Sequence, residues 1–554
     1  MPVAPLHLAL LTSALLWLTA PCLAATAGET PDAATDTAEP TFDVWEFQIE
    51  GNSLLTATEI ERAVYPHLGP ARTIVHVEAA RTALETLFRD KGYGTVIVDL
   101  PEQDVIDGIV LLRVVEGTVE RLRISGSRYF SLGRIKSYVP SLAEGEVPHL
   151  PTVQKELATL NQANRDRVIT PVLRPGKAAG TLEVDLKVDD ELPLHASVEL
   201  NDRYTLNTER LRLNAEVSYS NLWQKEHTIS AAYQVAPENR ENVEVFSTTY
   251  SFRLPDSDKL ITLYGVKTSS NVAAIGTLGV VGDGIIAGFR GTLPLPSLDG
   301  YFHSFTVGGD YKDFGESIEL LGADSLNTPI SYVSWSALYN GVSIAEHGTT
   351  ELSLGVTFAL RDLGNTLKEF QNRRFLAKPN FAIVSGSLTR QQPLPYGFEL
   401  VGAMNGQVAD SPLISNEQFS MGGFKSVRGY LESQQFVDDG VRGSLELRTP
   451  NLGDWLPEMA LWNPLNDFRI HLFVEGATGR VLEPLPLQDE SFSLWSAGLG
   501  FRVLAFRDFE AEFDWALPFR SGGVIERSPL TGDPLSFAVD DGESRVHFRM
   551  KYGF

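Results

Sequence analysis

Two stretches near the carboxyl end decide the fold of this chain: Phe509-Glu510-Ala511-Glu512-Phe513-Asp514-Trp515-Ala516-Leu517 and the last ten residues, 545–554 (RVHFRMKYGF). In both, apolar side chains alternate with charged ones. Because successive side chains of a β-strand point to opposite faces, each stretch predicts a strand with one apolar and one charged face. The same alternation occurs in 211–219 and 352–360. It is typical of a transmembrane barrel, whose strands turn an apolar face to lipid and a polar face to the lumen.

Working outward from these strands, the region 191–554 predicts an all-β barrel of 16 antiparallel transmembrane strands. The predicted strands begin near residues 192, 209, 226, 242, 259, 282, 301, 330, 348, 379, 397, 441, 468, 494, 508 and 544. The long connections follow odd-numbered strands, as extracellular loops do in such barrels, and residues 450–467 are the exception. A soluble array of β-sandwiches would not need a bare apolar face opposite a charged face on so many strands, so we favour the barrel.

The region before the barrel shows a mixed α and β pattern that occurs twice. The order strand, helix, helix, strand, strand begins at Phe47-Gln48-Ile49-Glu50-Gly51-Asn52 and is echoed by Leu122-Arg123-Ile124-Ser125-Gly126-Ser127. A capping box of Thr56 and Glu59 predicts the start of the first helix. We therefore expect two tandem α+β domains, at 42–118 and 119–190.

The first 41 residues are expected to lie outside the fold. Leu8 to Ala20 is apolar but short, and Cys22-Leu23-Ala24 is a cleavage pattern of small residues, so we interpret 1–24 as a secretory signal peptide. A lipoprotein signal acylated at Cys22 is the alternative, and Pro21 fits it badly. Residues 25–41 are small and polar and predict a flexible leader.

Composition and motifs exclude several classes of function. The 71 acidic residues outnumber the 46 basic ones, which gives a net charge of −25 and disfavours nucleic-acid binding. A single cysteine excludes a disulfide framework and a cysteine-based zinc site. The sequence contains no hydrolase nucleophile elbow, zinc-protease motif or phosphate-binding loop, and its ten histidines lack metal-ligand spacing. We therefore predict no enzyme activity, no cofactor and no metal.

Two weak patterns have simpler explanations within a barrel. Residues 282–287 match the glycine spacing of a dinucleotide-binding loop, but no helix follows them. The acidic row in 508–514 faces a basic row in 545–551, which is more simply a ladder of cross-strand pairs inside the lumen than a metal site.

One strand and one loop suggest a functional site. In the strand 468–475, alternation places Arg469, His471, Phe473 and Glu475 on the lumen face. The long loop 408–440 contains Val427-Arg428-Gly429-Tyr430, in which an arginine lies among apolar residues. Either Arg428 is an exposed loop arginine, the commoner situation, or the loop folds into the lumen and Arg428 pairs with Glu475.

These residues carry a resemblance to a known family. The chain resembles the TpsB transporters of two-partner secretion, the haemolysin-activator ShlB/FhaC/HecB-like branch of the BamA-related outer-membrane barrels. The segment from Gly92-Tyr93 through Leu100-Pro101-Glu102-Gln103-Asp104 to Arg113-Val114-Val115-Glu116-Gly117 resembles the first POTRA domain of that family. Val427-Arg428-Gly429-Tyr430 resembles the tip of its sixth loop, and Phe473-x-Glu475 stands where the family has Phe-x-Asp.

The resemblance implies a place and a mechanism. The barrel would lie in the outer membrane of a Gram-negative cell after insertion by the barrel-assembly machinery, in contact with outer-membrane lipid. Two periplasmic POTRA domains would capture the amino-terminal secretion domain of an unfolded exoprotein, which is haemolysin-like or adhesin-like. The exoprotein would thread through a mixed-charge lumen and fold outside. This path would be lined by Arg469, His471, Arg502, Arg545, Arg549, Lys551, Glu446, Glu510, Glu512 and Asp514.

In the same interpretation, Arg428 and Glu475 form the functional pair of loop and wall, and Tyr430 packs against lumen side chains such as Phe473. The alternative is a BamA-like assembly factor for outer-membrane proteins, which would share the barrel, the POTRA domains and the loop motif. A passive porin is a weaker candidate because it leaves about 150 residues of periplasmic domain unexplained.

Overall fold

The computed structural model describes residues 40–206, 208–254, 257–270, 272–275, 278–315, 317–319, 325–361, 363–455, 465–486, 488–506, 508–527 and 534–554. The predicted signal peptide, and nearly all of the predicted leader, lie outside the described residues. The chain forms two compact units, Met1–Gly117 and Thr118–Phe554. None of the described helices combines the length and the apolar composition needed to cross a membrane.

The first unit is a small α+β domain. Its central sheet has the order β2-β5-β4, in which β2 is parallel and β4 antiparallel to β5. Helix α2 packs Ala80, Leu84 and Phe88 into a core that also buries Leu112 of β5. The elements are β1 (Phe42–Val44), β2 (Glu46–Glu50), α1 (Ala57–Val64), η1 (Tyr65–His67), β3 (Gly69–Arg72), α2 (Ile74–Asp90), β4 (Ile97–Asp99) and β5 (Ile109–Val115).

The predicted order of elements is present in this unit, and β1 and β3 are added to it. The capping box of Thr56 and Glu59 begins α1, as the sequence predicts. β1 and β3 form a separate antiparallel pair. They are three and four residues long, too short for an alternating pattern to reveal.

The second unit begins with another α+β domain of the same order. Its sheet has the order β6-β8-β7, and the helices bury Ile135, Leu157 and Leu160 in one cluster with Val184 and Leu186 of the sheet. The elements are β6 (Thr118–Ser125), α3 (Leu132–Ser137), η2 (Pro140–Leu142), α4 (Leu150–Ala163), β7 (Arg167–Pro175) and β8 (Thr181–Asp190).

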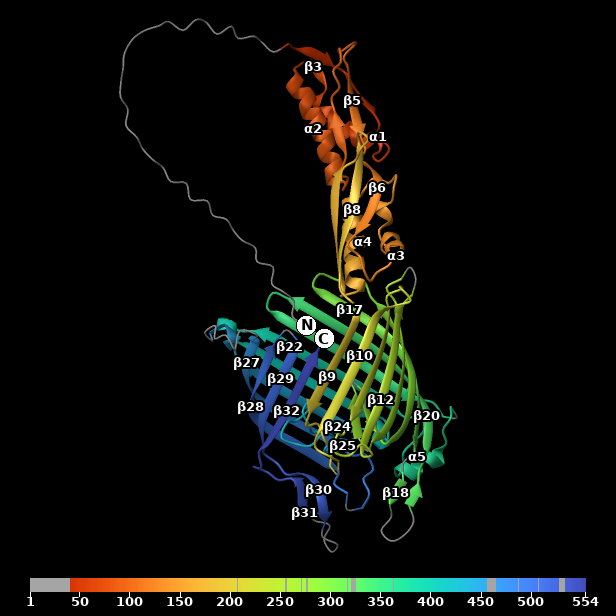
Figure 1. The fold of residues 1–554 in the computed structure, drawn as a ribbon, viewed down its shortest axis with the longest axis vertical. Helices are drawn as coiled ribbons and strands as arrows, with labels where there is room; N and C mark the ends of the chain where they lie inside the picture. The colour runs from red at the N-terminus through yellow and green to blue at the C-terminus, as the bar shows by residue number, and fades with distance from the viewer. Residues whose placement is uncertain are drawn as a thin grey trace, which may run out of the picture. The chain divides into compact units, whose positions relative to one another are not determined.

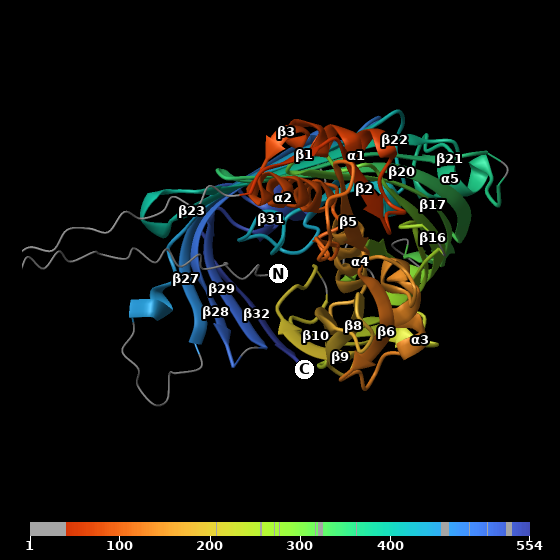
Figure 2. The same cartoon turned by 90° about the horizontal axis from the view of Figure 1, so that it is seen from above.

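The rest of the second unit is a closed barrel of sixteen antiparallel strands, which confirms the predicted fold class. Neighbours in sequence are neighbours in the barrel, and β32 closes it by pairing with β9, as Figures 1 and 2 show. The strands are β9 (Leu194–Asn201), β10 (Arg212–Leu222), β11 (His227–Val235), β12 (Val243–Arg253), β13 (Leu260–Ser270), β16 (Asp283–Pro294), β17 (Tyr301–Gly315), β20 (Ile330–Ala345), β21 (Gly348–Ala359), β22 (Ala382–Pro393), β23 (Glu399–Ala409), β26 (Asp439–Arg448), β27 (Leu465–Arg480), β28 (Ser491–Ala505), β29 (Phe509–Pro518) and β32 (Arg545–Gly553).

Alternation of side chains gives this barrel an apolar outside. On β27, Leu472 and Val474 are 55% and 52% exposed, whereas the intervening Phe473 is 2% exposed and points inward. Leu354 and Val356 on β21 and Met404 on β23 are exposed in the same way. A continuous band of exposed apolar side chains is what a barrel in contact with lipid requires.

The connections contain further short elements, including one helix that the sequence interpretation missed. The sequence predicts an all-β region over 191–554, but α5 (Leu367–Arg373) lies between β21 and β22. Thr366 and Glu369 form its capping box, and it buries Phe370. The other short elements are β14 (Val272–Ile275), β15 (Leu278–Val281), β18 (Ser317–Glu319), β19 (Ser325–Asn327), η3 (Pro395–Gly397), η4 (Ser415–Glu417), β24 (Phe419–Met421), β25 (Gln435–Val437), η5 (Leu452–Trp455), β30 (Gly522–Arg527) and β31 (Pro534–Val539).

The second α+β domain is joined to the barrel through the turn between β10 and β11. Arg167, on β7, is buried and forms an ion pair with Glu226 of the turn, and Tyr138 donates a hydrogen bond to the same carboxylate at 3.0 Å. The turn is strained, because Trp223, Gln224 and Glu226 all have positive φ angles. The buried contacts compensate for this strain and attach the domain to the barrel wall.

Candidate functional site

The long loop between β23 and β26, residues 410–438, folds into the barrel. A two-stranded hairpin of β24 and β25 forms its stem. At its tip, Val427 and Tyr430 are fully buried and Arg428 is 4% exposed. The structure therefore has the second of the two arrangements considered for Arg428, in which the loop lies inside the lumen.

Arg428 binds three carboxylates of the barrel wall. Its Nε and Nη2 donate to Glu475 Oε1 at 2.9 and 2.6 Å, and its backbone N–H donates to Glu475 Oε2 at 2.6 Å. Nη2 also donates to Glu446 at 3.0 Å, and Nη1 donates to Asp514 at 3.1 Å. The guanidinium carbon lies 3.4 Å from the ring centre of Phe473, in a cation–π contact. One cation thus holds acidic residues from β26, β27 and β29 together.

The register of the strands explains why these acids meet. On β26 and β27, Glu446 is opposite Phe473, and Ser444 is opposite Glu475, so all four share the lumen face. On β29, Asp514 shares its face with Glu512, and its carboxylate is 2.6 Å from Nε2 of His471. Alternation along each strand directs each acidic side chain into the lumen. The pairing of the strands places these side chains at the same height along the barrel axis.

Two glycines of β28 make room for the site. A Cβ atom at Gly498 would lie 2.4 Å from the ring of Phe473, and one at Gly500 would lie 1.9 Å from Asp514 Oδ1. No side chain therefore fits at either position while Phe473 and Asp514 keep their places. A glycine inside a strand often marks such a close approach, so Gly498-Leu499-Gly500 was a usable signal that the sequence interpretation did not take up.

The two residues after Arg428 complete the tip. Gly429 has φ of 93°, and its N–H donates to Nε2 of His547 on β32 at 2.9 Å. Because a positive φ favours glycine, this residue allows the tight turn. The hydroxyl of Tyr430 donates to the carbonyl of Arg520 at 2.8 Å. The tip thus contacts the last strand of the barrel as well as β26 to β29.

The environment of Tyr430 differs from the expected one. We expected Tyr430 to pack against Phe473, but it lies in an apolar cluster with Val427, Ala477 and Leu494. The face of Phe473 is occupied by Arg428 instead.

The charged lumen residues also have a role that differs from the expected one. Glu446, His471 and Asp514 surround the loop tip. Arg502 pairs with Glu512 at 2.8 Å, and Arg549 pairs with Glu510 at 3.1 Å. Of the predicted ladder between β29 and β32, Arg549 forms ion pairs with Glu510 and Glu512, whereas His547 pairs with Asp202. Glu446, His471 and Asp514 of the predicted mixed-charge path hold the loop tip instead of lining an open path. The sequence predicts Glu446 and Asp514 as residues of the lumen wall, but it does not indicate that they bind Arg428.

His471, Glu512 and Asp514 are the one group of described residues with a geometry that could hold a metal ion. The donor atoms of His471 and Asp514 already bind each other, and Asp514 also accepts from Arg428. This part of the site is thus organised around a guanidinium, and it carries no proposal of a metal centre.

A second buried charge holds the base of the same loop. Asp438 is fully buried and accepts hydrogen bonds from Arg374 at 2.8 and 2.6 Å. The backbone N–H groups of Leu413 and Leu482 donate to the same carboxylate at 2.9 and 2.7 Å. These partners come from three different loops, those between β21 and β22, between β23 and β26, and between β27 and β28. Asp438 therefore holds three loops together, as Arg428 holds three strands of the wall together.

Comparison with known proteins agrees with this architecture. A family model described as "POTRA domain, ShlB-type" matches residues 42–117, and one described as "Haemolysin secretion/activation protein ShlB/FhaC/HecB" matches residues 330–503. The outer membrane transporter CdiB of Escherichia coli O6:K15:H31 is 26% identical over 244 residues, which cover 42% of this chain and 41% of that protein. The heme/hemopexin transporter protein HuxB of Haemophilus influenzae is 21% identical over 416 residues, 72% of this chain and 71% of the relative.

Solved structures show the same fold. CdiB from Escherichia coli superposes with a TM-score of 0.61 at 20% identity and covers 95% of this chain and 93% of its own. BamA from Haemophilus ducreyi, lacking POTRA domains 1–3, has a TM-score of 0.54 at 13% identity and covers 93% and 100%.

A POTRA domain followed by a closed sixteen-strand barrel defines a class of outer-membrane barrel proteins whose amino-terminal domains lie in the periplasm. Within that class, two segments of this chain, 42–117 and 330–503, are similar to the ShlB/FhaC/HecB family.

Proposed function

We propose that this protein is the outer-membrane transporter of a two-partner secretion system. Its first POTRA domain, 42–118, and its second, 119–190, would receive an unfolded exoprotein in the periplasm through that protein's amino-terminal secretion domain. The barrel, 191–554, would pass the chain to the cell surface, where it folds. Residues 1–24 would direct the protein out of the cytoplasm, and the barrel-assembly machinery would insert it among outer-membrane lipids.

The observation that carries the proposal is the loop tip inside the barrel. A buried arginine bound to Glu475, Glu446 and Asp514 holds loop 410–438 against one part of the wall. We infer that Val427, Arg428, Gly429 and Tyr430, with Phe473 and Glu475, form the element that controls the lumen. A passive pore would need no such buried charge, which is costly unless it is fully paired.

The first unit supports the capture step. Its sheet has β2 and β4 at its edges, and Ile97 of β4 is exposed. An extended segment of a partner can add to such an edge through backbone hydrogen bonds. This mode of binding is tolerant of sequence, as capture of an unfolded chain requires.

Deleting the gene separates secretion from the alternative function, outer-membrane protein assembly. If the proposal is right, one secreted or surface protein disappears from the medium and the cell surface, and the other outer-membrane proteins keep their levels. A fall in many outer-membrane barrels would instead identify an assembly factor. Re-expression of the intact gene is the control, and it should restore the missing protein.

A further inference from the structure

Small hydroxyl side chains are frequent on the inner wall formed by β10 to β13, whereas charged side chains dominate the site around Arg428. Ser353 on β21 and Ser387 on β22, which are paired with each other, show that hydroxyl groups also occur in another arc of the barrel. The strand register aligns Ser218, Ser230 and Thr249 in one row across three strands. Ser251, two residues after Thr249 on β12, is paired with Thr262 on β13, and their hydroxyl groups are 2.9 Å apart. This part of the wall is polar but carries few charges. We refer to it as the hydroxyl wall.

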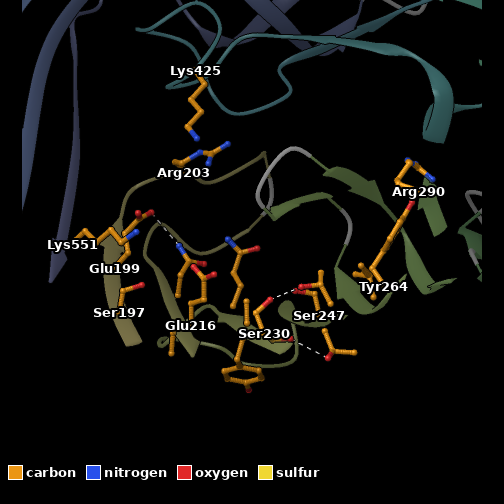
Figure 3. Close-up of a pocket in the computed structure, with 18 residues that line it drawn as sticks. Ser197, Glu199, Arg203, Glu216, Ser230, Ser247, Tyr264, Arg290, Lys425 and Lys551 are labelled. Carbon is orange, nitrogen blue, oxygen red and sulfur yellow. Dashed lines mark hydrogen bonds between the residues drawn. The ribbon is translucent and has the colours of Figure 1, made fainter. Parts of the chain in front are cut away.

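A cavity of about 500 Å³ lies against the hydroxyl wall. Ser197, Asn214, Ser230, Ser247 and Thr249 line it on the barrel side, and Lys425 of the long loop approaches from the other side, as Figure 3 shows. The cavity therefore lies between the wall and loop 410–438.

The charges around this cavity are largely balanced. Arg203 is paired with Glu432 at 2.9 Å, and Arg290 is paired with Asp310 at 2.6 Å. The lining also contains Lys425, Lys551, Glu199 and Glu216, and Glu199 is paired with Arg549 at 3.5 Å. A balanced lining attracts neither an acidic nor a basic segment strongly, because the Coulomb terms of opposite sign cancel over a few ångströms.

The tip of loop 410–438 covers the acidic part of the wall, on β26, β27 and β29. Arg428 and its neighbours occupy the inner faces of β26, β27 and β29, and Gly429 contacts β32. β10 to β13 form a different arc of the closed barrel, separated from that site by β9 on one side. The buried tip of the loop is thus held on one arc while the cavity adjoins another.

Hydroxyl groups suit contact with a moving peptide backbone. Each serine or threonine hydroxyl can donate to a carbonyl oxygen or accept from an N–H group. An extended chain can therefore exchange one partner for the next as it advances. An apolar wall would retain hydrophobic segments and a charged wall would retain segments of opposite charge, whereas a neutral hydroxyl surface has neither preference.

We propose that the exported polypeptide crosses the barrel in extended form along the hydroxyl wall, between β10–β13 and loop 410–438. This inference rests on the proposed function and adds the route. It differs from the mixed-charge path expected from the sequence, since Glu446, His471 and Asp514 of that path hold the loop tip and Lys551 of that path lines the cavity.

The test compares two serine-to-tryptophan variants of the full-length protein. Ser230→Trp places a large side chain on the hydroxyl wall. Ser387→Trp is the matched control, because Ser387 on β22 is also a half-buried serine beside an exposed aliphatic residue and is paired with another serine, Ser353, but it does not line the cavity. The first readout is export of the protein that gene deletion removes, and the second is KCl conductance in planar lipid bilayers. Heat-modifiable gel migration verifies that both barrels have assembled.

We expect Ser230→Trp to lower export and conductance severalfold, and Ser387→Trp to leave both near the wild-type level. A block by Ser387→Trp alone, an equal effect of both variants, or no effect of either would overturn the route while the secretion function stands. If gene deletion removes no surface protein, the secretion function fails, and the polypeptide route fails with it. The conductance measurements would then still show where ions cross, so the two failures are distinguishable.

Discussion

At the scale of single residues, the loop tip depends on one arginine. Arg428 is the common partner of Glu475, Glu446 and Asp514, and its planar group presents several donors in a fixed fork. Lysine would supply a point charge but could not reach the same set of oxygens. Removing one member of a buried ion pair leaves the others uncompensated and costs about 3–5 kcal/mol.

We therefore expect Arg428→Ala to reduce secretion by about tenfold or more, since 1.4 kcal/mol already corresponds to a factor of ten. The barrel should still assemble, because the strand pairing holds its wall. Channel conductance should change as the tip leaves the wall, and Glu475→Ala should give a similar but milder defect. Arg210→Ala is the matched control, because Arg210 is exposed in another loop. Normal secretion by Arg428→Ala would show that the loop tip has no functional role.

At the scale of elements, charge pairs connect helices that the apolar core already brings together. In the first unit, Lys91 at the end of α2 pairs with Glu59 at the start of α1. The hydrogen bonds from Lys91 and Thr56 lower the pKa of Glu59 from 4.5 to about 2. A carboxylate whose pKa is lowered by folding stabilises the fold above its unfolded-state pKa, and this stabilisation is lost as the pH falls through the folded-state value.

Glu59→Gln should therefore weaken protection of the α1 amides against hydrogen exchange at pH 7, while the difference from wild type should vanish near pH 2. The glutamine keeps the cap of α1 and removes only the charge. The pair is solvent-exposed, so the effect should be small. Glu61→Gln is the control, because Glu61 is an exposed glutamate on the same helix. A difference that persists unchanged at pH 2 would assign the effect to the cap and exclude the charge as its cause.

At the scale of the whole molecule, the barrel has no edge strand. β32 pairs with β9 through five residue pairs, Arg549–Gly553 with Ser197–Asn201, and this pairing closes the seam. Closure of this kind is what allows strands to remain stable in lipid, where an unpaired backbone group costs several kcal/mol.

We expect the protein to cofractionate with outer-membrane markers and to migrate faster on a gel when it is not heated, because the closed barrel resists detergent. Heating should abolish the difference. A variant that lacks β32, residues 545–554, is the control and should migrate alike with and without heating, since its sheet cannot close. Recovery of the intact protein in the soluble periplasm would contradict the membrane placement.

Elements whose residue pattern is periodic could be predicted from the amino-acid sequence. Alternation over ten or more residues reveals both faces of a strand, so the sixteen strands and the inward direction of Glu475 followed directly from the residue pattern. The capping box of Thr56 and Glu59 is equally local. Helix α5 carries a comparable signal in Thr366 and Glu369, and its short length within a strand-rich region concealed it.

Which inward-facing side chains come into contact depends on the folded barrel and could not be predicted from the residue pattern. Glu446, Glu475 and Asp514 are separated by tens of residues, and they converge because strand register sets their height and because Gly498 and Gly500 leave space beside them. The hydroxyl wall arises in the same way, from serines and threonines aligned across four strands. A sequence records the direction of each side chain along its own strand, but the distance between side chains on different strands depends on pairing and closure.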